Sequence, residues 1–243
     1  MDPRLNIIDK RLANIKKLVA VSGAKGGVGK SLVASTLALS LSEYGYKVGL
    51  LDLDFCGPSD HIILGIKDVH PIEDRGVVPP KIYGIKFMSI IYYAGNRPSP
   101  LRGVDISNSI IELLAITQWG ALDFLIVDMP PGIGDATLDA IRLMKGSQFI
   151  VITTQSKVAL ATVSKLVKML KELGVPIIGI IENMRIMKSS FIQEQTKIFN
   201  IPFLGGIDFD KNLETSIGDA NKLLKTSFTQ SIKKIIQTYL KLD

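Results

Sequence analysis

The sequence predicts an α/β fold of the three-layer, doubly wound kind, in which helices cover both faces of a mostly parallel sheet. Short apolar runs rich in β-branched residues alternate with longer stretches of helical periodicity along the chain. Most of these runs are continuously apolar, as is typical of central strands that are covered on both faces. No repeat, low-complexity tract or break in composition divides the chain, so we expect a single domain over residues 1–243.

Six strands are expected where the short apolar runs occur. They lie at 17–22, 47–52, 85–91, 122–128, 148–153 and 176–181. In chain order, the runs read K-L-V-A-V-S, K-V-G-L-L-D, I-K-F-M-S-I-I, L-D-F-L-I-V-D, Q-F-I-V-I-T and P-I-I-G-I-I. Because helical stretches separate most of them, we expect parallel pairing through right-handed crossovers.

Six helices are expected where apolar residues recur at intervals of three and four. They lie at 30–44, 105–118, 135–144, 157–173, 189–199 and 226–241. Residues 1–16 are interpreted as a lead-in, and the Pro- and Gly-punctuated stretch 65–104 as a loop-rich excursion above the sheet edge.

The C-terminal segment 226–243 is amphipathic. Its apolar stripe comprises Phe228, Ile232, Ile235, Ile236, Tyr239 and Leu240, with lysines off the stripe. The periodicity fits both a helix docked on the sheet and a helix that lies on a membrane surface, and we expect the docked arrangement.

The composition excludes several classes of protein. The single cysteine, Cys56, rules out an intrachain disulfide and an all-protein zinc site with two or four cysteines. His61 and His70 lie in loop-rich sequence and are interpreted as structural or surface residues. The net charge of +6 includes no arginine-rich run or basic–aromatic ladder, which disfavours a nucleic-acid module. With no signal-peptide core and no apolar run near the roughly 18 residues of a membrane span, we expect a cytoplasmic location.

Residues 22–31, Ser-Gly-Ala-Lys-Gly-Gly-Val-Gly-Lys-Ser, form the strongest motif. They follow an expected strand and open an expected helix, which is the context of a phosphate-binding P-loop. Glycines let backbone N–H groups turn toward phosphate oxygens, and the helix N-terminus adds positive potential. Lys30 is expected to reach the β- and γ-phosphates and Ser31 to bind Mg²⁺. Ala24 replaces the first glycine of the strict pattern, and Lys25 adds a second lysine.

Acidic residues close two of the expected strands. Asp52 and Asp54 lie at the end of the second strand, and Asp128 ends 122–128 just before Met-Pro-Pro-Gly. A carboxylate at the end of a buried strand beside a P-loop is suited to hold Mg²⁺, directly or through water. Taken singly, each aspartate also fits the role of a helix cap, and their grouping beside the P-loop favours the metal site. The stiff Pro-Pro-Gly turn is suited to move as a unit when a γ-phosphate leaves.

With these motifs the chain resembles the deviant P-loop ATPases of the MinD/ParA/nitrogenase-iron-protein superfamily. It is most similar to the Mrp/ApbC branch of iron–sulfur cluster carriers, from about residue 15 to 225. The motifs are K-G-G-V-G-K-S (25–31), D-L-D-F-C-G-P-S (52–59), L-R-G (101–103), W-G-A-L-D-F-L-I-V-D-M-P-P-G-I-G-D (119–135), T-T-Q-S-K-V-A-L (153–160), I-E-N-M (181–184) and P-F-L-G-G-I (202–207).

The resemblance implies an ATPase that works as an ATP-sandwich homodimer with ATP and Mg²⁺. Its catalytic residues would be Lys25, which reaches the partner's ATP, Lys30, and Asp54, which positions the attacking water. Ser31, Asp52 and Asp128 would hold Mg²⁺, directly or through water. The nucleotide-binding residues would be Gly26, Gly27, Val28, Gly29, Lys30, Ser31, Leu32 and Asn183, the last at the adenine. The implied partner is an iron–sulfur apo-protein or another protein, whereas membrane and DNA are disfavoured.

The sequence departs from this family at the cluster site. Carriers of the branch follow Asn-Met with a C-x-x-C that ligates a bridging iron–sulfur cluster, and those positions are Ser189 and Ile192 here. Neither offers a thiolate, so the sequence predicts an intact ATPase without the family's cluster ligands. Cys56 is the remaining candidate ligand, against the alternative of a small buried apolar residue. Lesser departures are Ala24, Val104, Thr162 and Asp208.

Two other functions stay open. A MinD/ParA-like positioning ATPase that acts on a membrane or nucleoid would use the basic C-terminal third and the segment 226–243. A non-catalytic regulator would bind ATP only to gate a protein partner. Turnover of ATP and binding to liposomes or DNA would distinguish these functions.

Overall fold

The computed structural model describes residues 2–55, 57–94 and 103–239. Its strands are β1 (Ile15–Ser22), β2 (Val48–Asp52), β3 (Ile72–Glu73), β4 (Val77–Val78), β5 (Lys81–Ile82), β6 (Ile85–Ser89), β7 (Leu122–Asp128), β8 (Gln148–Thr153), β9 (Ile177–Arg185) and β10 (Phe203–Asp208). Its helices are α1 (Arg4–Leu12), α2 (Lys30–Glu43), α3 (Asp60–Leu64), α4 (Ile91–Ala94), α5 (Gly103–Ile116), α6 (Asp135–Leu143), α7 (Lys157–Glu172), α8 (Phe191–Ile198), the 3₁₀ helix η1 (Leu213–Ser216), α9 (Ala220–Leu223) and α10 (Ser227–Tyr239).

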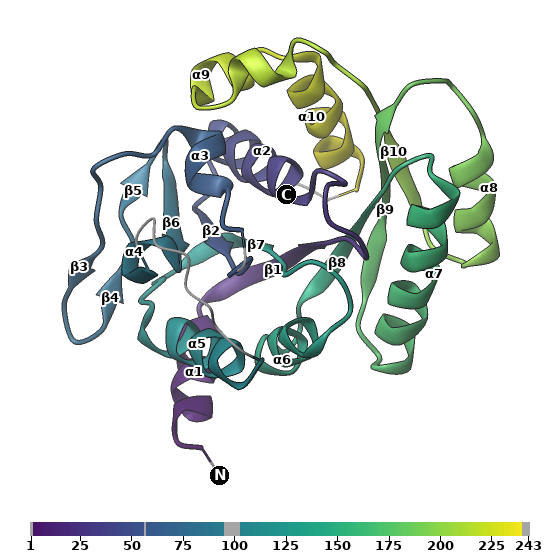
Figure 1. Ribbon diagram of the computed structural model, residues 1–243. Coiled ribbons are helices and arrows are strands. Elements are labelled where there is room, and N and C mark those ends of the chain that lie inside the picture. Colours follow the sequence, from purple (N-terminus) through teal and green to yellow (C-terminus); the bar gives the residue numbers. More distant parts are fainter. Residues whose placement is uncertain (1, 56, 95–102, 240–243) are drawn as a thin grey trace.

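β1 lies in the middle of one twisted sheet (Figure 1). In the described part of the chain the strand order is β10-β9-β8-β1-β7-β2-β6-β5. Neighbouring strands are parallel except for β5, which pairs antiparallel with β6 at the edge. The expectation of a mostly parallel sheet is confirmed.

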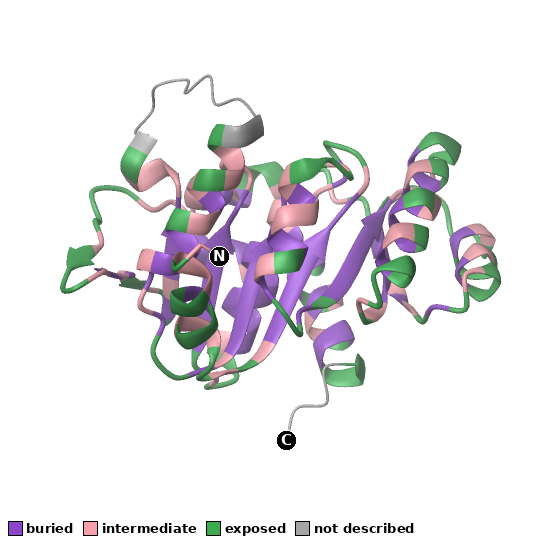
Figure 2. Cartoon of the chain, turned by 90° about the horizontal axis from the view of Figure 1, so that it is seen from below, coloured by how far each residue is buried: buried purple, intermediate pink, exposed green. Residues whose placement is uncertain are grey.

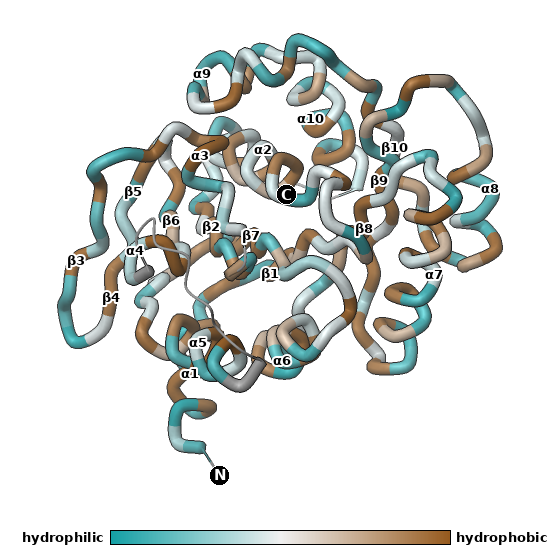
Figure 3. The backbone as a smooth tube through the Cα atoms, in the orientation of Figure 1, coloured by the Kyte–Doolittle hydropathy of each residue, from teal (hydrophilic) through white to brown (hydrophobic). Residues whose placement is uncertain are grey.

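Two apolar cores lie on opposite faces of the sheet, and β1 contributes to both. Leu18 and Ala20 belong to one core and Val19 and Val21 to the other, because successive strand residues point to opposite faces. The first core is covered by α1, α5, α6, α7 and α8, and the second by α2, α3, α9 and α10. Figure 2 shows the strands buried and the outer faces of the helices exposed, and Figure 3 shows hydrophobic residues along the strands. The three-layer architecture is confirmed.

The last helix, α10, is docked on the sheet. Phe228, Ile232, Ile235 and Ile236 are all buried in the core that α2 shares. Lys233, off the apolar stripe, forms an ion pair of 2.6 Å with Glu43 of α2. Residues 227–239 therefore have the docked arrangement, whereas Leu240 lies outside the described residues. In the parts of the chain that the structure describes, every helix is too short or too polar to cross a membrane.

Several expected elements have different ends. The strand expected at 85–91 stops at Ser89, because the Ser89 hydroxyl accepts a hydrogen bond from the Ile91 N–H and α4 begins there. The strand expected at 176–181 runs on to Arg185, because the adjacent β10 extends its pairing to the pair Arg185 and Asp208.

Other elements were not expected. Besides the expected strand β6, the described part of the stretch 65–104 contains the short strands β3, β4 and β5 and the helix α4, so it is more regular than the loop-rich interpretation implied. Within the lead-in 1–16, residues 4–12 form α1, which buries Ile8 in the first core. β10 reads F-L-G-G-I-D, and its two glycines weaken the strand pattern.

The carboxyl ends of the central strands meet at one edge of the sheet. Val21 near the end of β1 is paired with Asp128 at the end of β7, and Asp128 with Asp52 at the end of β2. The loops that follow these strands therefore converge, as they do where open α/β sheets bind ligands.

Candidate nucleotide and magnesium site

The phosphate loop runs from the end of β1 to the start of α2. Gly27 has a φ of +76° and Gly29 a φ of +87°, a backbone region that favours glycine. Gly29 directly precedes the 14-residue helix α2, whose first N–H groups have no partner within the helix. The loop therefore ends at a helix N-terminus, which favours an anion.

Lys30 is the first residue of α2, and its side chain is only 6% exposed. Its ammonium nitrogen lies 3.9 Å from a carboxylate oxygen of Asp54, the residue after β2 and Leu53. The other Asp54 oxygen accepts a hydrogen bond from the Gly57 N–H at 3.1 Å. The structure thus brings together two of the three expected catalytic residues.

The third expected catalytic residue, Lys25, is exposed in the same loop. It forms no ion pair with any residue that the structure describes, in contrast to the buried Lys30. Its charge is therefore available to a group outside this chain.

Asn183 of β9 reaches the phosphate loop from the side. Its amide nitrogen donates a hydrogen bond of 2.9 Å to the carbonyl oxygen of Val28, and the residue is 2% exposed. A Cβ at Gly29 would lie 2.3 Å from the same nitrogen, so the contact requires glycine there. Asn183 therefore braces the loop, a structural role that the sequence did not predict for it.

Beside this contact lies a pocket of about 200 Å³. It is lined by Leu32, Asn183, Met184, Asp208, Phe209, Asp210, Lys211, Leu213, Glu214, Ile217 and Phe228. Two expected nucleotide-binding residues, Leu32 and Asn183, are among them. The pocket adjoins the phosphate loop and combines apolar walls with charged groups, as a site for a nucleoside does.

Asp52 and Asp128 end neighbouring strands and are fully buried. Asp52 accepts hydrogen bonds from the Asp54 N–H at 3.0 Å and from the Ser89 hydroxyl at 3.3 Å. Neither carboxylate oxygen of Asp128 accepts a hydrogen bond of ordinary length and angle from the described residues, although the Ser31 hydroxyl lies close to them. Burial raises the pKa of Asp128, and the Lys30 ammonium and the Ser31 hydroxyl oppose that rise. Buried carboxylate oxygens without donors, next to a serine hydroxyl, fit the oxygen ligands that Mg²⁺ prefers.

A third buried carboxylate, Asp60, was missed by the sequence analysis. It is the first residue of α3, and its carboxylate oxygens approach those of Asp52 and Asp128 so that the three groups lie within 4.8 Å of one another. One Asp60 oxygen accepts a 2.5 Å hydrogen bond from Ser35 of α2. Burial and the charges of Asp128 and Asp52 raise the pKa of Asp60. The signal that could have revealed it is its helical spacing with the buried Ile63 and Leu64.

The two positions of the family's cysteine pair have structural roles. The Ser189 hydroxyl accepts a hydrogen bond from the Phe191 N–H at 3.1 Å, at the start of α8. Ile192 is fully buried in the first core. Neither side chain fits a cluster ligand, and Cys56 lies outside the described residues.

Neither histidine belongs to the acidic group, although His61 directly follows Asp60 in α3. Burial lowers the pKa of His61, and the ring of His70 packs edge-on against Tyr92 with centroids 6.3 Å apart. In the described part of the chain, the grouping that could hold a metal ion consists of Asp52, Asp60 and Asp128. The interpretation of both histidines as structural or surface residues stays a prediction.

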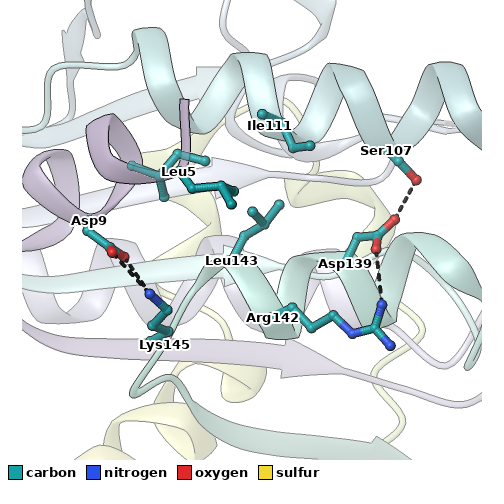
Figure 4. Close-up of a pocket in the computed structure, with 9 residues that line it drawn as sticks. Leu5, Asp9, Ser107, Ile111, Asp139, Arg142, Leu143 and Lys145 are labelled. Carbon is teal, nitrogen blue, oxygen red and sulfur yellow. Dashed lines mark hydrogen bonds and ion pairs between the residues drawn. The ribbon is translucent and has the colours of Figure 1, made fainter. Parts of the chain in front are cut away.

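A separate hollow of about 280 Å³ lies between α1, α5 and α6 (Figure 4). Its apolar floor includes Leu5, Ile111 and Leu143. Its rim carries the Asp9–Lys145 ion pair of 3.0 Å and the Asp139–Arg142 pair of 3.9 Å. No expected site residue lines it, so it is not part of the nucleotide site.

Comparison with known proteins agrees with this geometry. The model of the ParA family described as NUBPL iron-transfer P-loop NTPase matches residues 14–241. An iron–sulfur cluster carrier protein of Aquifex aeolicus is 41% identical over 179 residues, 72% of this chain and 49% of that protein. A cytosolic Fe-S cluster assembly factor NUBP2 homolog of Trichoplax adhaerens is 37% identical, with 91% of this chain and 89% of that protein covered.

Among solved structures, a nucleotide-binding protein from Archaeoglobus fulgidus in complex with ADP superposes with a TM-score of 0.77. It is 30% identical, and the match covers 91% of this chain and 93% of that one. The chain spans about half the length of its Aquifex relative, whereas it spans most of the Archaeoglobus protein.

Proposed function

The chain belongs to the ParA family of NUBPL-type iron-transfer P-loop NTPases, and on that premise we propose that it binds Mg-ATP and hydrolyses it. One observation carries the proposal. The phosphate loop, the buried Lys30 and the carboxylates of Asp52, Asp54 and Asp128 converge at one edge of the sheet. Each group is of the type that phosphoryl transfer requires at this position.

The triphosphate is held by the loop. Backbone N–H groups of residues 26–32 at the start of α2 bind phosphate oxygens, and Lys30 neutralises the β- and γ-phosphates. Leu32 and Asn183 line the adjoining pocket, where the nucleoside lies. Because Lys30 is the ion-pair partner of Asp54, an incoming phosphate competes for the ammonium and leaves Asp54 to orient water.

The reaction is an in-line displacement at the γ-phosphorus. Water oriented by Asp54 attacks, the bond from the γ-phosphorus to the bridging oxygen breaks, and ADP and inorganic phosphate leave. Lys30 offsets the negative charge that develops on the phosphate oxygens. Preorganised charge in a buried site is effective because little water screens it.

Ser31, Asp52 and Asp128 are the residues that would hold Mg²⁺, directly or through water. The ion, when bound, supplies positive charge against the β- and γ-phosphate oxygens. The fit rests on the two buried Asp128 oxygens, which have no donor among the described residues.

Lys25 supports a homodimer as the working form. It is exposed, it has no ion-pair partner in the described part of the chain, and it occupies the motif position whose lysine reaches a partner's ATP. A second ammonium at each γ-phosphate would offset further charge in the transition state. The dimer would bind an iron–sulfur apo-protein or another protein partner in the cytoplasm.

Iron–sulfur clusters are the cargo that the relatives' names describe. Ser189 and Ile192 do not fit a cluster, because neither offers a thiolate and Ile192 is fully buried. The residues at these positions therefore do not support binding of a cluster by this chain. Hydrolysis of ATP is the function that the site supports best.

Release of phosphate from ATP tests the proposal. We expect turnover by the wild type and a loss of roughly a hundredfold or more in Asp54→Ala, because the water loses its orienting carboxylate. Asp9→Ala, an exposed carboxylate on α1, is the control and should leave turnover unchanged. Wild-type turnover no faster than that of Asp54→Ala would remove the assignment.

A further inference from the structure

The buried carboxylate of Asp60 has no role in the proposed ATP reaction. Asp60 is fully buried, although aspartate is among the residues least often buried without a partner. It reaches Asp52 and Asp128 because α3 packs against α2, where Ser35 holds one of its oxygens. The second oxygen has no hydrogen-bond partner among the described residues.

The unpartnered oxygens point to a ligand. Both oxygens of Asp128 and one of Asp60 are buried without a donor, whereas both oxygens of Asp52 accept hydrogen bonds. Asp128 is fully buried, and its carboxylate lies within 4.8 Å of those of Asp52 and Asp60. A buried carboxylate without a donor is strongly unfavourable, so these oxygens require a proton or a cation.

The positive charge that the chain provides nearby is too small to neutralise three carboxylates. The Lys30 ammonium is engaged by Asp54 at 3.9 Å and is one charge against three. A Mg²⁺ ion that a protein binds together with phosphates commonly uses one or two carboxylates and keeps several waters. Three carboxylates are more than such a site needs, and they favour a hard divalent cation that takes oxygen ligands.

We propose that Asp60 completes a divalent-cation site with Asp52 and Asp128 that binds Mg²⁺ or Mn²⁺ before any nucleotide enters. This deepens the proposed function and rests on it, because the same ion would then meet the β- and γ-phosphates. The metal would be a resident of the folded chain and would not arrive only as part of Mg-ATP. Ser35 is the positioning residue that orients Asp60 toward the other two carboxylates.

Binding of Mn²⁺ to the nucleotide-free full chain tests this proposal. The electron paramagnetic resonance signal of free Mn²⁺ falls as the ion is bound, and added Mg²⁺ should restore the signal by competition. We expect one Mn²⁺ per chain for the wild type. Asp60→Asn should bind it roughly tenfold or more weakly, because the change removes the charge and retains an acceptor for Ser35. Asp9→Asn, the same change at an exposed site on α1, should bind as the wild type does.

Two results would overturn the proposal: no Mn²⁺ bound by the nucleotide-free wild type, or equal affinity in wild type and Asp60→Asn. If Asp60→Asn does not fold, Ser35→Ala replaces it. That variant keeps the carboxylate and loses its hydrogen bond, so weaker Mn²⁺ binding supports the proposal and unchanged binding contradicts it.

ATP turnover, measured in parallel, separates this proposal from the proposed function. Turnover by a wild type that binds no Mn²⁺ without nucleotide would leave the ATPase standing and remove the role of Asp60. Binding of Mn²⁺ without any turnover would support the cation site and remove the ATPase.

Discussion

Gly29 and Asn183 meet where the phosphate loop touches β9. The asparagine amide donates to the Val28 carbonyl, and a Cβ on Gly29 would lie 2.3 Å from that amide nitrogen. The loop is thus held by a side chain from a strand more than 150 residues away in sequence. The geometry of the binding site therefore depends on individual contacts such as this one.

Substituting alanine at Gly29 and at a second glycine of similar φ distinguishes the effect of the Asn183 contact from the effect of backbone strain. Gly29→Ala should lose ATP affinity, because the new Cβ displaces Asn183 and the loop has a φ of +87°. Gly146→Ala is the matched control, with a φ of +78° and nothing within 4 Å of its Cβ. The control should lose about 1–2 kcal/mol of stability and retain ATP binding. Titration with a fluorescent ATP analogue measures the affinity, and urea unfolding measures the stability. An equal loss of ATP affinity in the two variants would contradict a role of the Asn183 contact in ATP binding.

The helix α8 lies at the positions of the family's cysteine pair, which are Ser189 and Ile192 in this chain. The helix begins after Ser190, its N-cap residue, and the Ser189 hydroxyl accepts a hydrogen bond from the Phe191 N–H. Ile192 packs in the first core. Helical spacing predicted the element over 189–199, and the structure has it over 191–198. Residues 189 and 190 precede the helix, because Ser190 is the N-cap residue.

Introducing the family's cysteine pair should therefore not create a cluster site. In a Ser189→Cys, Ile192→Cys variant, the second thiol should lie in the core, because residue 192 is fully buried. Anaerobic reconstitution with iron and sulfide should yield no iron–sulfur absorption and no bound iron. The Ser189→Cys single variant is the control. Stoichiometric iron in the double variant would show that α8 can turn residue 192 outward.

The last helix, α10, stabilises the fold through its buried stripe. Ile236→Ala should cost about 2–5 kcal/mol, because it leaves a cavity between α10 and α2. Ile198→Ala makes the same change in α8 at a residue that is 72% exposed, and it should stay within about 0.5 kcal/mol of the wild type. Urea unfolding measures both. Equal stability of the two variants would mean that α10 is not docked in solution.

At the scale of the whole molecule, the sequence predicted the centre of the sheet better than its margins. The central strands are continuous apolar runs, so their pattern is strong, and the phosphate loop and its aspartates follow from them. β10 contains adjacent glycines, and β3 to β5 are two residues each, so local pattern could not identify them. The sequence did not predict Asp60 as part of the acidic group, because its position there depends on the tertiary packing of α3 against α2.

The whole chain is expected to form a dimer that depends on ATP. Asp54→Ala with ATP should accumulate as a dimer in light scattering, because hydrolysis no longer separates the two copies. Adding Lys25→Ala to that variant should abolish the dimer and leave ATP binding in place, since this exposed lysine would reach the partner's phosphates. Lys165→Ala, an exposed lysine on α7, is the control. A dimer that survives Lys25→Ala would contradict the sandwich arrangement.

The pairing of Asp52 with Asp128 across β2 and β7 links the site to the assembly of the sheet. A slip of one residue between these strands would turn one carboxylate to the opposite face and separate the pair. A chain with a misaligned sheet would therefore lack the site altogether. During synthesis, the ability to retain a cation or nucleotide would then distinguish correctly assembled copies from misassembled ones, so that the ligand stabilises only the finished fold.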